Sequence, residues 1–399
     1  MDAIIVSTLK LVNTHRPPSQ SSKRMLESAD EIMSELTDVL SAIATLHERG
    51  ERMALATIVS VRGSTYRRPG ARLLVPEHSA PVGNVSGGCL EGDVERIGRE
   101  VMAAGEPRLE LFDLTADADE VWGYGLGCNG AMELFIEPAE HAITTAVALR
   151  TAIEDERACC LVTVLASSVD GVAPGSRLLR HANGTTEKGL GLETADAAAI
   201  LLADVALATD TSSVEVQAGL RLFVEVLDPP PRLLVCGAGH DAVPLVRFAT
   251  ELGWRVTVAD VRRPFLTRDR FPEAVDFLDV DPEGVAEALG IDRRTYAVLM
   301  SHNYLRDVEY LRSLLGGDLA YIGALGPRKR TLQLLRDLDR VDAIDQIHAP
   351  AGLDIGGEGP EEVAWAIVAE MLAVRRGRSG GFLRERRAPI HEFGELSPR

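Results

Sequence analysis

The sequence predicts an α/β protein in two parts: an N-terminal α/β domain with an internal β-unit duplication, and a C-terminal Rossmann-like domain with a doubly wound parallel sheet. A strand and turn pattern in residues 55–74 recurs in residues 161–179, which indicates the duplication. Three prolines at 229–231 can continue neither helix nor sheet, and a strand, a glycine turn and a helical pattern follow directly. We therefore expect a disordered leader over 1–28, a first domain over 29–227, a proline linker over 228–231, a Rossmann-like domain over 232–378 and a tail over 379–399.

The composition limits the kinds of partner. The chain has 399 residues and carries 60 acidic against 42 basic side chains, a formal net charge of −18. This acidic balance argues against nucleic acid and anionic membranes as main partners. The five cysteines are an odd number without the spacing of a secreted protein, and no apolar run reaches the ~18 residues that cross a bilayer. We expect a cytoplasmic protein with reduced thiols and no membrane segment.

The first domain is expected to begin with a helix and two strands. Apolar residues from Ile32 to Leu46 recur at helical spacing, and Gly50 closes this pattern. Residues 53–61 are a nearly continuous β-prone run, which is typical of a strand buried on both faces. A second strand is expected at 73–75.

The loop between these strands, residues 62–72, is a candidate anion site. It places Gly63 and Ser64 near several arginines, among them Arg68, and it turns at Gly70. Guanidinium groups and a Gly-Ser turn suit a phosphate or a carboxylate. The alternative is a solvated hairpin loop, and this loop alone does not decide between the two.

A glycine-rich loop around one thiol is the main candidate for the chemistry. Gly87 and Gly88 allow the backbone to approach a flat or anionic ligand closely, and Cys89 follows them. A helical pattern begins at Asp93, so the thiol lies near a helix N-terminus, where a thiolate is stabilised. A lone cysteine at a tight turn is also typical of a small buried side chain.

A second glycine loop repeats this design around Gly127 and Cys128. Two such loops in one domain favour a ligand site over a purely structural turn. Glycines flank Cys128 on both sides, whereas Cys89 precedes Leu90 and a helix. We therefore expect Cys128 to face the ligand and Cys89 to turn toward the core, so that loss of Cys89 costs stability as well as binding.

The recurring β unit separates the scaffold from the candidate site. The second copy keeps the strands and the Pro-Gly turn, at Pro174 and Gly175, but no Gly-Gly-Cys sequence follows it. The chemistry is therefore expected in the first copy. Helices are expected at 142–153 and 193–208, and a closing strand at 219–226.

A dinucleotide-binding pattern opens the second domain. After a strand that ends at Cys236, the residues Gly237, Gly239 and Ala242 fill the pattern G-x-G-x-x-[G/A], with His240 inside it. In this setting the glycines make a tight turn that lets a pyrophosphate approach the following helix. The pattern is fairly specific for the fold and less so for a bound nucleotide.

The next strand, residues 255–259, ends in Asp260. An acidic group at this place binds ribose hydroxyls in dinucleotide-binding proteins. Arg262 and Arg263 follow directly and leave room for a 2′-phosphate. The sequence therefore does not separate NAD from NADP.

Later strands are expected at 296–300 and 319–322, and a final helix at 360–373. His302 lies at the carboxyl end of the first of these strands, where open α/β sheets bind ligands. It can serve as an acid or base, or cap the helix that contains Asp307.

Several motifs in a fixed order carry a resemblance to a known family. They are Gly63-Ser64 with Arg68-Pro69-Gly70, residues 86–92, residues 125–130, Gly237 to His240, Ser301 to Asn303 with Asp307, residues 321–326 and residues 348–362. With these motifs the chain resembles the XdhC/CoxI family of maturation factors for molybdenum hydroxylases, over roughly residues 36–378. Pro327 and Ser301 depart from the residues often found in the family.

The resemblance implies a carrier for molybdenum cofactor. Such a protein binds the cofactor, as molybdopterin or its cytosine dinucleotide, and holds it while a cysteine desulfurase installs its terminal sulfur. It then inserts the cofactor into an apo-molybdenum hydroxylase of the xanthine dehydrogenase, CO dehydrogenase or aldehyde oxidoreductase type. From patterns and resemblance together, the expected cofactor-binding residues are Gly63, Ser64, Arg68, Gly70, Gly87, Gly88, Cys89, Glu91, Gly127, Cys128, Gly237, Gly239, His240, Ala242, Asp260 and His302.

The chemistry of this cofactor agrees with the residues. Arginines with a Gly-Ser turn would hold its phosphate, glycine loops would admit the flat pterin, and a soft thiolate from Cys128 or Cys89 would contact the molybdenum. The Rossmann groove would take a nucleotide, either NAD(P) or the cytidine part of the cofactor.

Two functions of different classes follow. The first is a carrier without turnover, because no Ser-His-Asp set, metal triad or acid/base pair can be assembled around the thiols. The alternative is an NAD(P)-dependent oxidoreductase with His302 as its acid or base. Since a labile cofactor needs shielding from water, a homodimer is expected in which the Rossmann domain covers the thiol loops.

Overall fold

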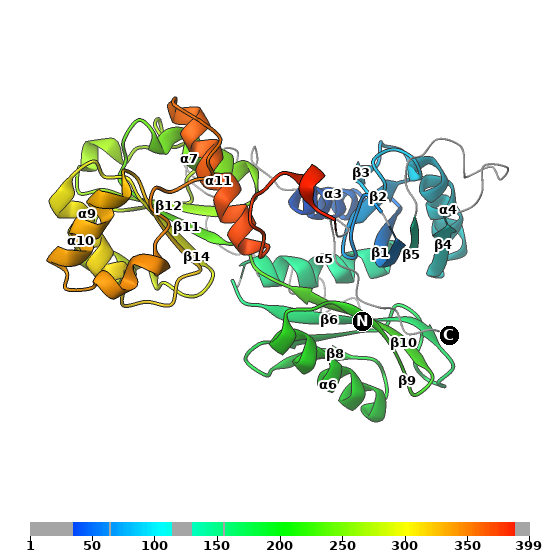
Figure 1. The fold of residues 1–399 in the computed structure, drawn as a ribbon. Helices are drawn as coiled ribbons and strands as arrows, with labels where there is room; N and C mark the ends of the chain where they lie inside the picture. Colours follow the sequence, from blue (N-terminus) through cyan, green and yellow to red (C-terminus); the bar gives the residue numbers. More distant parts are fainter. Residues whose placement is uncertain (1–34, 64, 114–129, 155, 388–399) are drawn as a thin grey trace, which may run out of the picture. The chain divides into compact units, whose positions relative to one another are not determined.

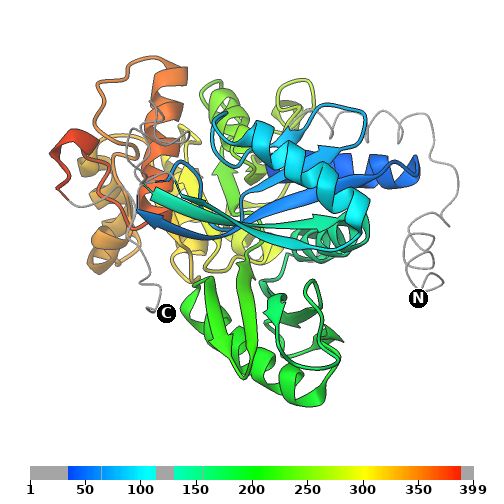
Figure 2. The same cartoon turned by 90° about the vertical axis from the view of Figure 1, so that its right-hand side faces the viewer.

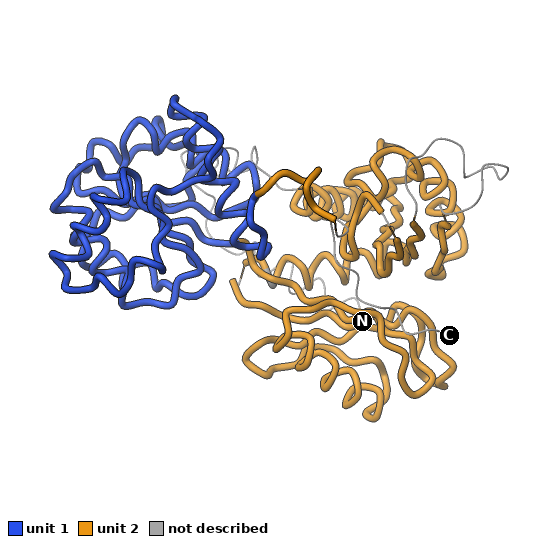
Figure 3. Tube along the Cα trace, viewed as in Figure 1, with its two compact units in different colours: residues 1–33, 231–380 blue, residues 34–230, 381–399 orange. Residues whose placement is uncertain are grey.

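The computed structural model describes residues 35–63, 65–113, 130–154 and 156–387. They form two compact units, drawn in orange and blue in Figure 3. The N-terminal unit runs from Ser34 to Pro230 and includes the described residues after Gly380, and the C-terminal unit runs from Pro231 to Gly380. The predicted leader over 1–28 lies outside the described residues. None of the helices in the described part of the chain is long and apolar enough to cross a membrane.

The N-terminal unit contains one succession of elements twice (Figure 1). Each copy has a helix, three strands, a second helix and two further strands. The first copy comprises α3 (Glu35–Glu48), β1 (Met53–Gly63), β2 (Arg72–Pro76), β3 (Val82–Gly83), α4 (Glu91–Ala104), β4 (Arg108–Asp113) and β5 (Gly130–Pro138). The second copy comprises α5 (Ala139–Glu154), β6 (Cys159–Ser167), β7 (Arg177–His181), β8 (Thr186–Gly189), α6 (Glu193–Thr209), β9 (Ser213–Gln217) and β10 (Leu220–Leu227).

Each copy forms one five-stranded antiparallel sheet with the same strand order. The first sheet has the order β3-β2-β1-β5-β4, and the second has the order β8-β7-β6-β10-β9. The long strands β1 and β6 hold the equivalent central place, each between its hairpin partner and the last strand of its copy. The predicted duplication is confirmed, and it extends beyond the recurring strand pair to the helices and to every strand.

The central strand β1 is buried on both faces along residues 53–60, as its continuous apolar sequence predicts. One face packs against α4, which lies across the first sheet in Figure 2. The residues Val94, Ile97 and Val101 share the buried side of that helix. The other face contributes to a core that includes α3 and α5. A small cluster from both sheets joins the two copies: Val59, Phe135, Leu165 and Phe223.

Two buried ion pairs also join the copies. Arg72 of β2 donates to both carboxylate oxygens of Glu225 on β10, at 2.8 and 2.6 Å. Arg177 of β7 pairs with Glu137 of β5. The four side chains are only 1–7% exposed. Because β2 corresponds to β7 and β5 to β10, the duplication relates one pair to the other.

The Pro-Gly turns of the repeat support these ion pairs. The carbonyl of Gly70 accepts a hydrogen bond from Arg72 at 2.6 Å, and that of Gly175 accepts one from Arg177 at 2.8 Å. Gly70 has a φ of 91°, and a Cβ there would lie 3.0 Å from Glu225 Oε1. The turn therefore recurs because it positions a buried arginine in each copy. Gly70, expected among the cofactor-binding residues, lies at this interface.

The C-terminal unit is a doubly wound parallel sheet, which confirms the predicted fold class. Its strand order is β13-β12-β11-β14-β15, with every neighbouring pair parallel. Helices α7 and α11 pack on one face, and α9 and α10 pack on the other (Figure 1). The strands are β11 (Arg232–Cys236), β12 (Arg255–Ala259), β13 (Asp276–Leu278), β14 (Thr295–Leu299) and β15 (Tyr321–Ala324). Its α-helices are α7 (Ala242–Glu251), α8 (Val285–Leu289), α9 (Tyr304–Leu314), α10 (Arg328–Asp337) and α11 (Pro360–Arg375). Its 3-10 helices are η1 (Arg263–Phe265), η2 (Pro282–Gly284) and η3 (Val341–Gln346). A further 3-10 helix, η4 (Leu383–Glu385), follows Gly380 and groups with the N-terminal unit.

Candidate functional site

Glu91 organises the first thiol loop, which connects β3 to α4. Its carboxylate accepts hydrogen bonds from the backbone N–H groups of Ser86 (2.9 Å), Gly88 (2.9 Å) and Leu90 (3.2 Å). The hydroxyl of Ser86 also donates to it. The N–H of Gly87 donates to the side chain of Asn84 at 2.9 Å. The loop is therefore held by its own acceptors, and the N–H groups of residues 86–88 are engaged within it rather than directed at a ligand.

Cys89 is exposed in this loop, whereas its neighbour Leu90 is fully buried. The expectation that Cys89 turns toward the core is wrong, because Leu90 takes the buried position where α4 begins. Cys159, Cys160 and Cys236 are buried, and burial raises the pKa of the Cys160 thiol to about 12. In the described part of the chain, Cys89 is thus the thiol that a ligand can reach.

Tyr66, which the sequence patterns did not indicate, lies beside the thiol loop. It is 65% exposed, and a Cβ on Gly87 would lie 3.2 Å from two atoms of its ring. Gly87 and Gly88 have φ angles of 81° and 110°, a region that other residues rarely adopt, and the space next to Gly88 is open. An exposed ring, an open stretch of backbone and an exposed thiol therefore lie together. In the sequence, the sign that could have pointed to Tyr66 is that it is a single tyrosine among the arginines of residues 62–72.

Two arginines of that loop are paired with carboxylates elsewhere in the N-terminal unit. Arg72 belongs to the buried ion pair described above, and Arg67 pairs with Glu35 at 2.5 Å. Arg68 is half-buried, and burial lowers the pKa of its guanidinium, which still stays protonated at neutral pH. We retain Arg68, which the sequence indicated, as a candidate for binding an anion.

Ser64, Gly127 and Cys128 lie outside the described residues. The strand residues next to these segments are paired with each other. Gly63, the last residue of β1, lies opposite Gly130, the first residue of β5. The arginine loop and the second thiol loop are therefore attached to neighbouring strand ends.

No group of three or more His, Cys, Asp or Glu side chains within the described ranges could hold a metal ion. The donors of these ranges do not build a metal centre by themselves.

Glu91→Gln should loosen the thiol loop in a pH-dependent way. Burial by itself raises the pKa of Glu91, but hydrogen bonds from the Ser86 side chain and the loop backbone outweigh it, and the pKa lies below its ordinary value of 4.5. The stabilisation by Glu91 is therefore complete above pH 4.5 and is lost as the pH falls through the lowered pKa. At neutral pH we expect the substitution to lower the free energy of unfolding by about 1–3 kcal/mol.

Melting curves of wild type and variant across pH test this expectation. The difference in Tm should shrink as the pH falls below 4.5 and through the lowered pKa of Glu91, because wild-type Glu91 then becomes protonated as well. Glu95→Gln is a matched control on the same helix, since Glu95 forms an i,i+4 pair with Arg99 and should contribute little. Equal Tm values for the two variants would show that Glu91 does not hold the loop.

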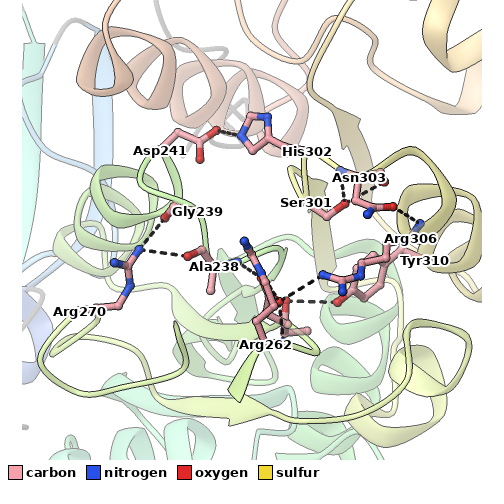
Figure 4. A network of polar contacts seen from close by, with 12 residues as sticks. Ala238, Gly239, Asp241, Arg262, Arg270, Ser301, His302, Asn303, Arg306 and Tyr310 are labelled. Atoms are coloured by element: carbon pink, nitrogen blue, oxygen red, sulfur yellow. Dashed lines mark hydrogen bonds and ion pairs between the residues drawn. The ribbon is translucent and has the colours of Figure 1, made fainter. Parts of the chain in front are cut away.

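A second candidate site lies at the carboxyl edge of the parallel sheet, in the turns after β11, β12 and β14 (Figure 4). Gly237 has a φ of 125°, and a Cβ there would lie 2.6 Å from the carbonyl oxygen of Met300. Glycine is required because the turn after β11 passes directly over the end of β14. Gly239 follows in the same turn, His240 is exposed, and the buried Ala242 begins α7.

Asp260 was expected to bind ribose hydroxyls, but its carboxylate oxygens already accept hydrogen bonds from the protein itself. Its Oδ1 accepts from the backbone N–H and Nε of Arg262, at 2.8 and 2.9 Å. Its Oδ2 accepts from the N–H of Ala238 and Nη2 of Arg262, at 2.8 and 2.6 Å. Burial by itself raises the pKa of Asp260, but these hydrogen bonds outweigh it and the pKa lies below its ordinary value. The ionised side chain therefore fixes the glycine turn to the end of β12.

His302 joins the turns after β14 and β11. Its Nε2 lies 2.7 Å from Oδ2 of Asp241, and its φ of 54° is unusual for a residue with a side chain. His302 does not cap α9, which was one of its two expected roles. Asn303 does so, because its Oδ1 accepts from the N–H of Arg306 at 3.2 Å. The exposed imidazole is thus oriented by a carboxylate at the edge of the glycine turn.

Comparison with known proteins identifies relatives of similar length. Residues 46–113 match the XdhC and CoxI family, and residues 233–371 match the XdhC Rossmann domain. A protein of Bacillus subtilis (strain 168), named as a probable subunit of xanthine dehydrogenase, is 32% identical over 335 residues, which cover 83% of this chain and 96% of that protein. The molybdenum cofactor insertion chaperone PaoD of Escherichia coli (strain K12) is 24% identical over 330 residues, 82% of this chain and 84% of PaoD. A crystal structure described as a xanthine dehydrogenase from Bacillus halodurans superposes with a TM-score of 0.70 at 29% identity, over 87% of this chain and 97% of that one.

Proposed function

The chain belongs to the XdhC and CoxI family, and on that premise we propose that it is a maturation factor that carries molybdenum cofactor to a molybdenum hydroxylase. One relative is named a molybdenum cofactor insertion chaperone, and another is named for xanthine dehydrogenase. The structural observation that carries the proposal is the exposed Cys89 on a loop pre-ordered by Glu91, next to the open backbone at Gly88 and the exposed ring of Tyr66.

Each of these features suits a different part of the cargo. The thiolate of Cys89 is a soft donor for molybdenum. The open backbone at Gly88 allows a flat pterin to approach, and the ring of Tyr66, which lies against Gly87, offers it a stacking surface. Arg68 supplies a guanidinium for the phosphate. In this proposal Cys128 contributes a second thiol from the loop that ends beside Gly130.

The proposal names three macromolecular partners. A cysteine desulfurase would install the terminal sulfur while the cargo is held, and an apo-molybdenum hydroxylase would receive it. The exposure of Cys89 and Tyr66 leaves the cargo open to water, so we propose that a second copy of this chain shields it in a homodimer. A single-chain mass in light scattering at micromolar concentration would exclude the homodimer.

A retention assay tests the carrier function. Purified protein mixed with molybdenum cofactor and passed over a gel-filtration column should retain about one cofactor per chain, and molybdopterin should be compared with the cytosine dinucleotide in parallel. Tyr66→Ala should weaken retention, whereas Tyr66→Phe should preserve it, because stacking needs the ring and not the hydroxyl. A chain that retains neither form of the cofactor would refute the carrier function.

An NAD(P)-dependent oxidoreductase is the second candidate function. The pairing of His302 with Asp241 beside the glycine turn favours it, since a carboxylate-oriented imidazole is a common acid or base. The saturation of Asp260 counts against the usual mode of NAD binding. Turnover of a carbonyl substrate with either nicotinamide cofactor would support this candidate.

A further inference from the structure

The turns that surround Asp260 form a site whose ligand class differs from that of an ordinary dinucleotide-binding loop. From the geometry we infer that this site binds a nucleotide through a phosphate on its ribose, held by Arg262 and Arg306, and that it rejects a free ribose diol. The inference concerns the C-terminal unit and is independent of the carrier function proposed for the thiol loop.

Hydrogen bonds from the protein itself occupy the carboxylate of Asp260. An ionised carboxylate offers about four acceptor positions. Four hydrogen bonds, three from Arg262 and one from Ala238, already use them at 2.6–2.9 Å, and the residue is 2% exposed. A ribose diol can form hydrogen bonds to the carboxylate of Asp260 only if it displaces Arg262. The displaced guanidinium of Arg262 would then lose the carboxylate to which both its Nε and its Nη2 donate.

Guanidinium groups gather at the carboxyl edge of the parallel sheet around Asp260. Arg262 and Arg306, both labelled in Figure 4, lie 2.6 and 3.9 Å from oxygens of Asp260, so two guanidinium groups share one carboxylate. Arg330 lies 2.7 Å from the buried Asp307. Arginines therefore outnumber the carboxylates that they contact, in a chain whose net charge is −18. A local positive surplus on an acidic protein favours an anionic ligand.

Arg270 lies on the same aromatic ring as Arg262. Its guanidinium and that of Arg262 both lie on the ring of Phe265, at 5.0 and 4.3 Å from the ring centroid. Arg270 donates to the carbonyls of Ala238 and Gly239, and its buried Nε has no hydrogen-bond partner in the described part of the chain. Phe265 thus lies against two guanidinium groups beside the glycine turn.

Titration of the full-length protein with NADP+ and NAD+ tests the inference, because these probes differ only in the 2′-phosphate. NADP+ should bind at least roughly tenfold more tightly, and its affinity should fall as salt is raised. Equal affinities, tighter binding of NAD+, or no binding of either probe at about 1 mM would overturn the inference. Cytidine 5′-diphosphate carries a free diol and should not displace NADP+, and displacement would also overturn it.

Arg262→Ala gives two effects of opposite sign. The variant loses the main phosphate donor and releases Asp260, so affinity for NADP+ should fall roughly tenfold while affinity for NAD+ rises. Arg263→Ala is the matched control, since Arg263 is 81% exposed and pairs with Asp279, and it should change neither affinity. Arg306→Gln should lower the affinity for NADP+ but not that for NAD+, because Arg262 still occupies Asp260. It serves as a second variant if Arg262→Ala has too low a Tm for the titration. A parallel loss of both affinities in Arg262→Ala would overturn the inference.

Discussion

Arg72→Met should lower the free energy of unfolding of the N-terminal unit by about 3–5 kcal/mol. The substitution removes one member of a buried ion pair and leaves Glu225 charged, nearly inaccessible to water and without its guanidinium. Arg177→Met should have a similar effect, because its pair with Glu137 is the equivalent one in the second copy. Chemical denaturation monitored by circular dichroism measures both changes.

Two controls separate a buried charge from lost packing. Arg72→Met combined with Glu225→Leu should recover most of the stability, since an apolar pair of similar volume often replaces a buried ion pair without loss. Arg52→Met should cost less than about 1 kcal/mol, because Arg52 pairs with Glu77 at the exposed surface. A loss in Arg72→Met no larger than that in Arg52→Met would show that the pair does not hold the copies together.

Cys89→Ser should lower the affinity for molybdenum cofactor by at least roughly tenfold, or ~1.4 kcal/mol, with an unchanged Tm. The side chain is exposed, so its replacement removes a ligand atom and almost no packing. Cofactor-binding isotherms and melting curves of the same preparations provide the measurement.

Cys160→Ala is the matched control for this prediction. Cys160 is fully buried in the core of the second copy, and its loss should cost about 1 kcal/mol of stability while cofactor affinity stays unchanged. Normal affinity in Cys89→Ser would assign the metal contact to Cys128 and leave the Cys89 loop with a role in shaping the site by its backbone alone.

The parallel strands were predictable from the sequence because burial on both faces leaves a continuous apolar signature. The strands at 232–236 and 255–259 are found with these bounds. The duplication was visible through its strands and its Pro-Gly turn. Its helices were not recognisable as a pair, because α4 carries charged residues on its surface whereas α6 is rich in alanine.

The roles of individual side chains depended on partners that are distant in sequence. The arginines of residues 62–72 have the composition of an anion site, yet Arg72 is engaged by Glu225, 153 positions away. Asp260 stands at the ribose position of the dinucleotide pattern, but Arg262 occupies its oxygens. Sequence spacing also could not decide whether Cys89 or Leu90 takes the buried place at the start of α4. These choices are set by packing and charge pairing in three dimensions.

Reconstitution of a molybdenum hydroxylase tests the central claim most directly. Cofactor, cysteine desulfurase and an apo-enzyme of the xanthine dehydrogenase type are combined with this protein, with its Cys89→Ser variant, or without either, and hydroxylase activity is followed over time. The carrier function predicts that activity appears fastest with the wild-type chain and that the variant, although folded, gives little more than the reaction without it. Equal activation in the presence and absence of the wild-type chain would contradict the carrier function.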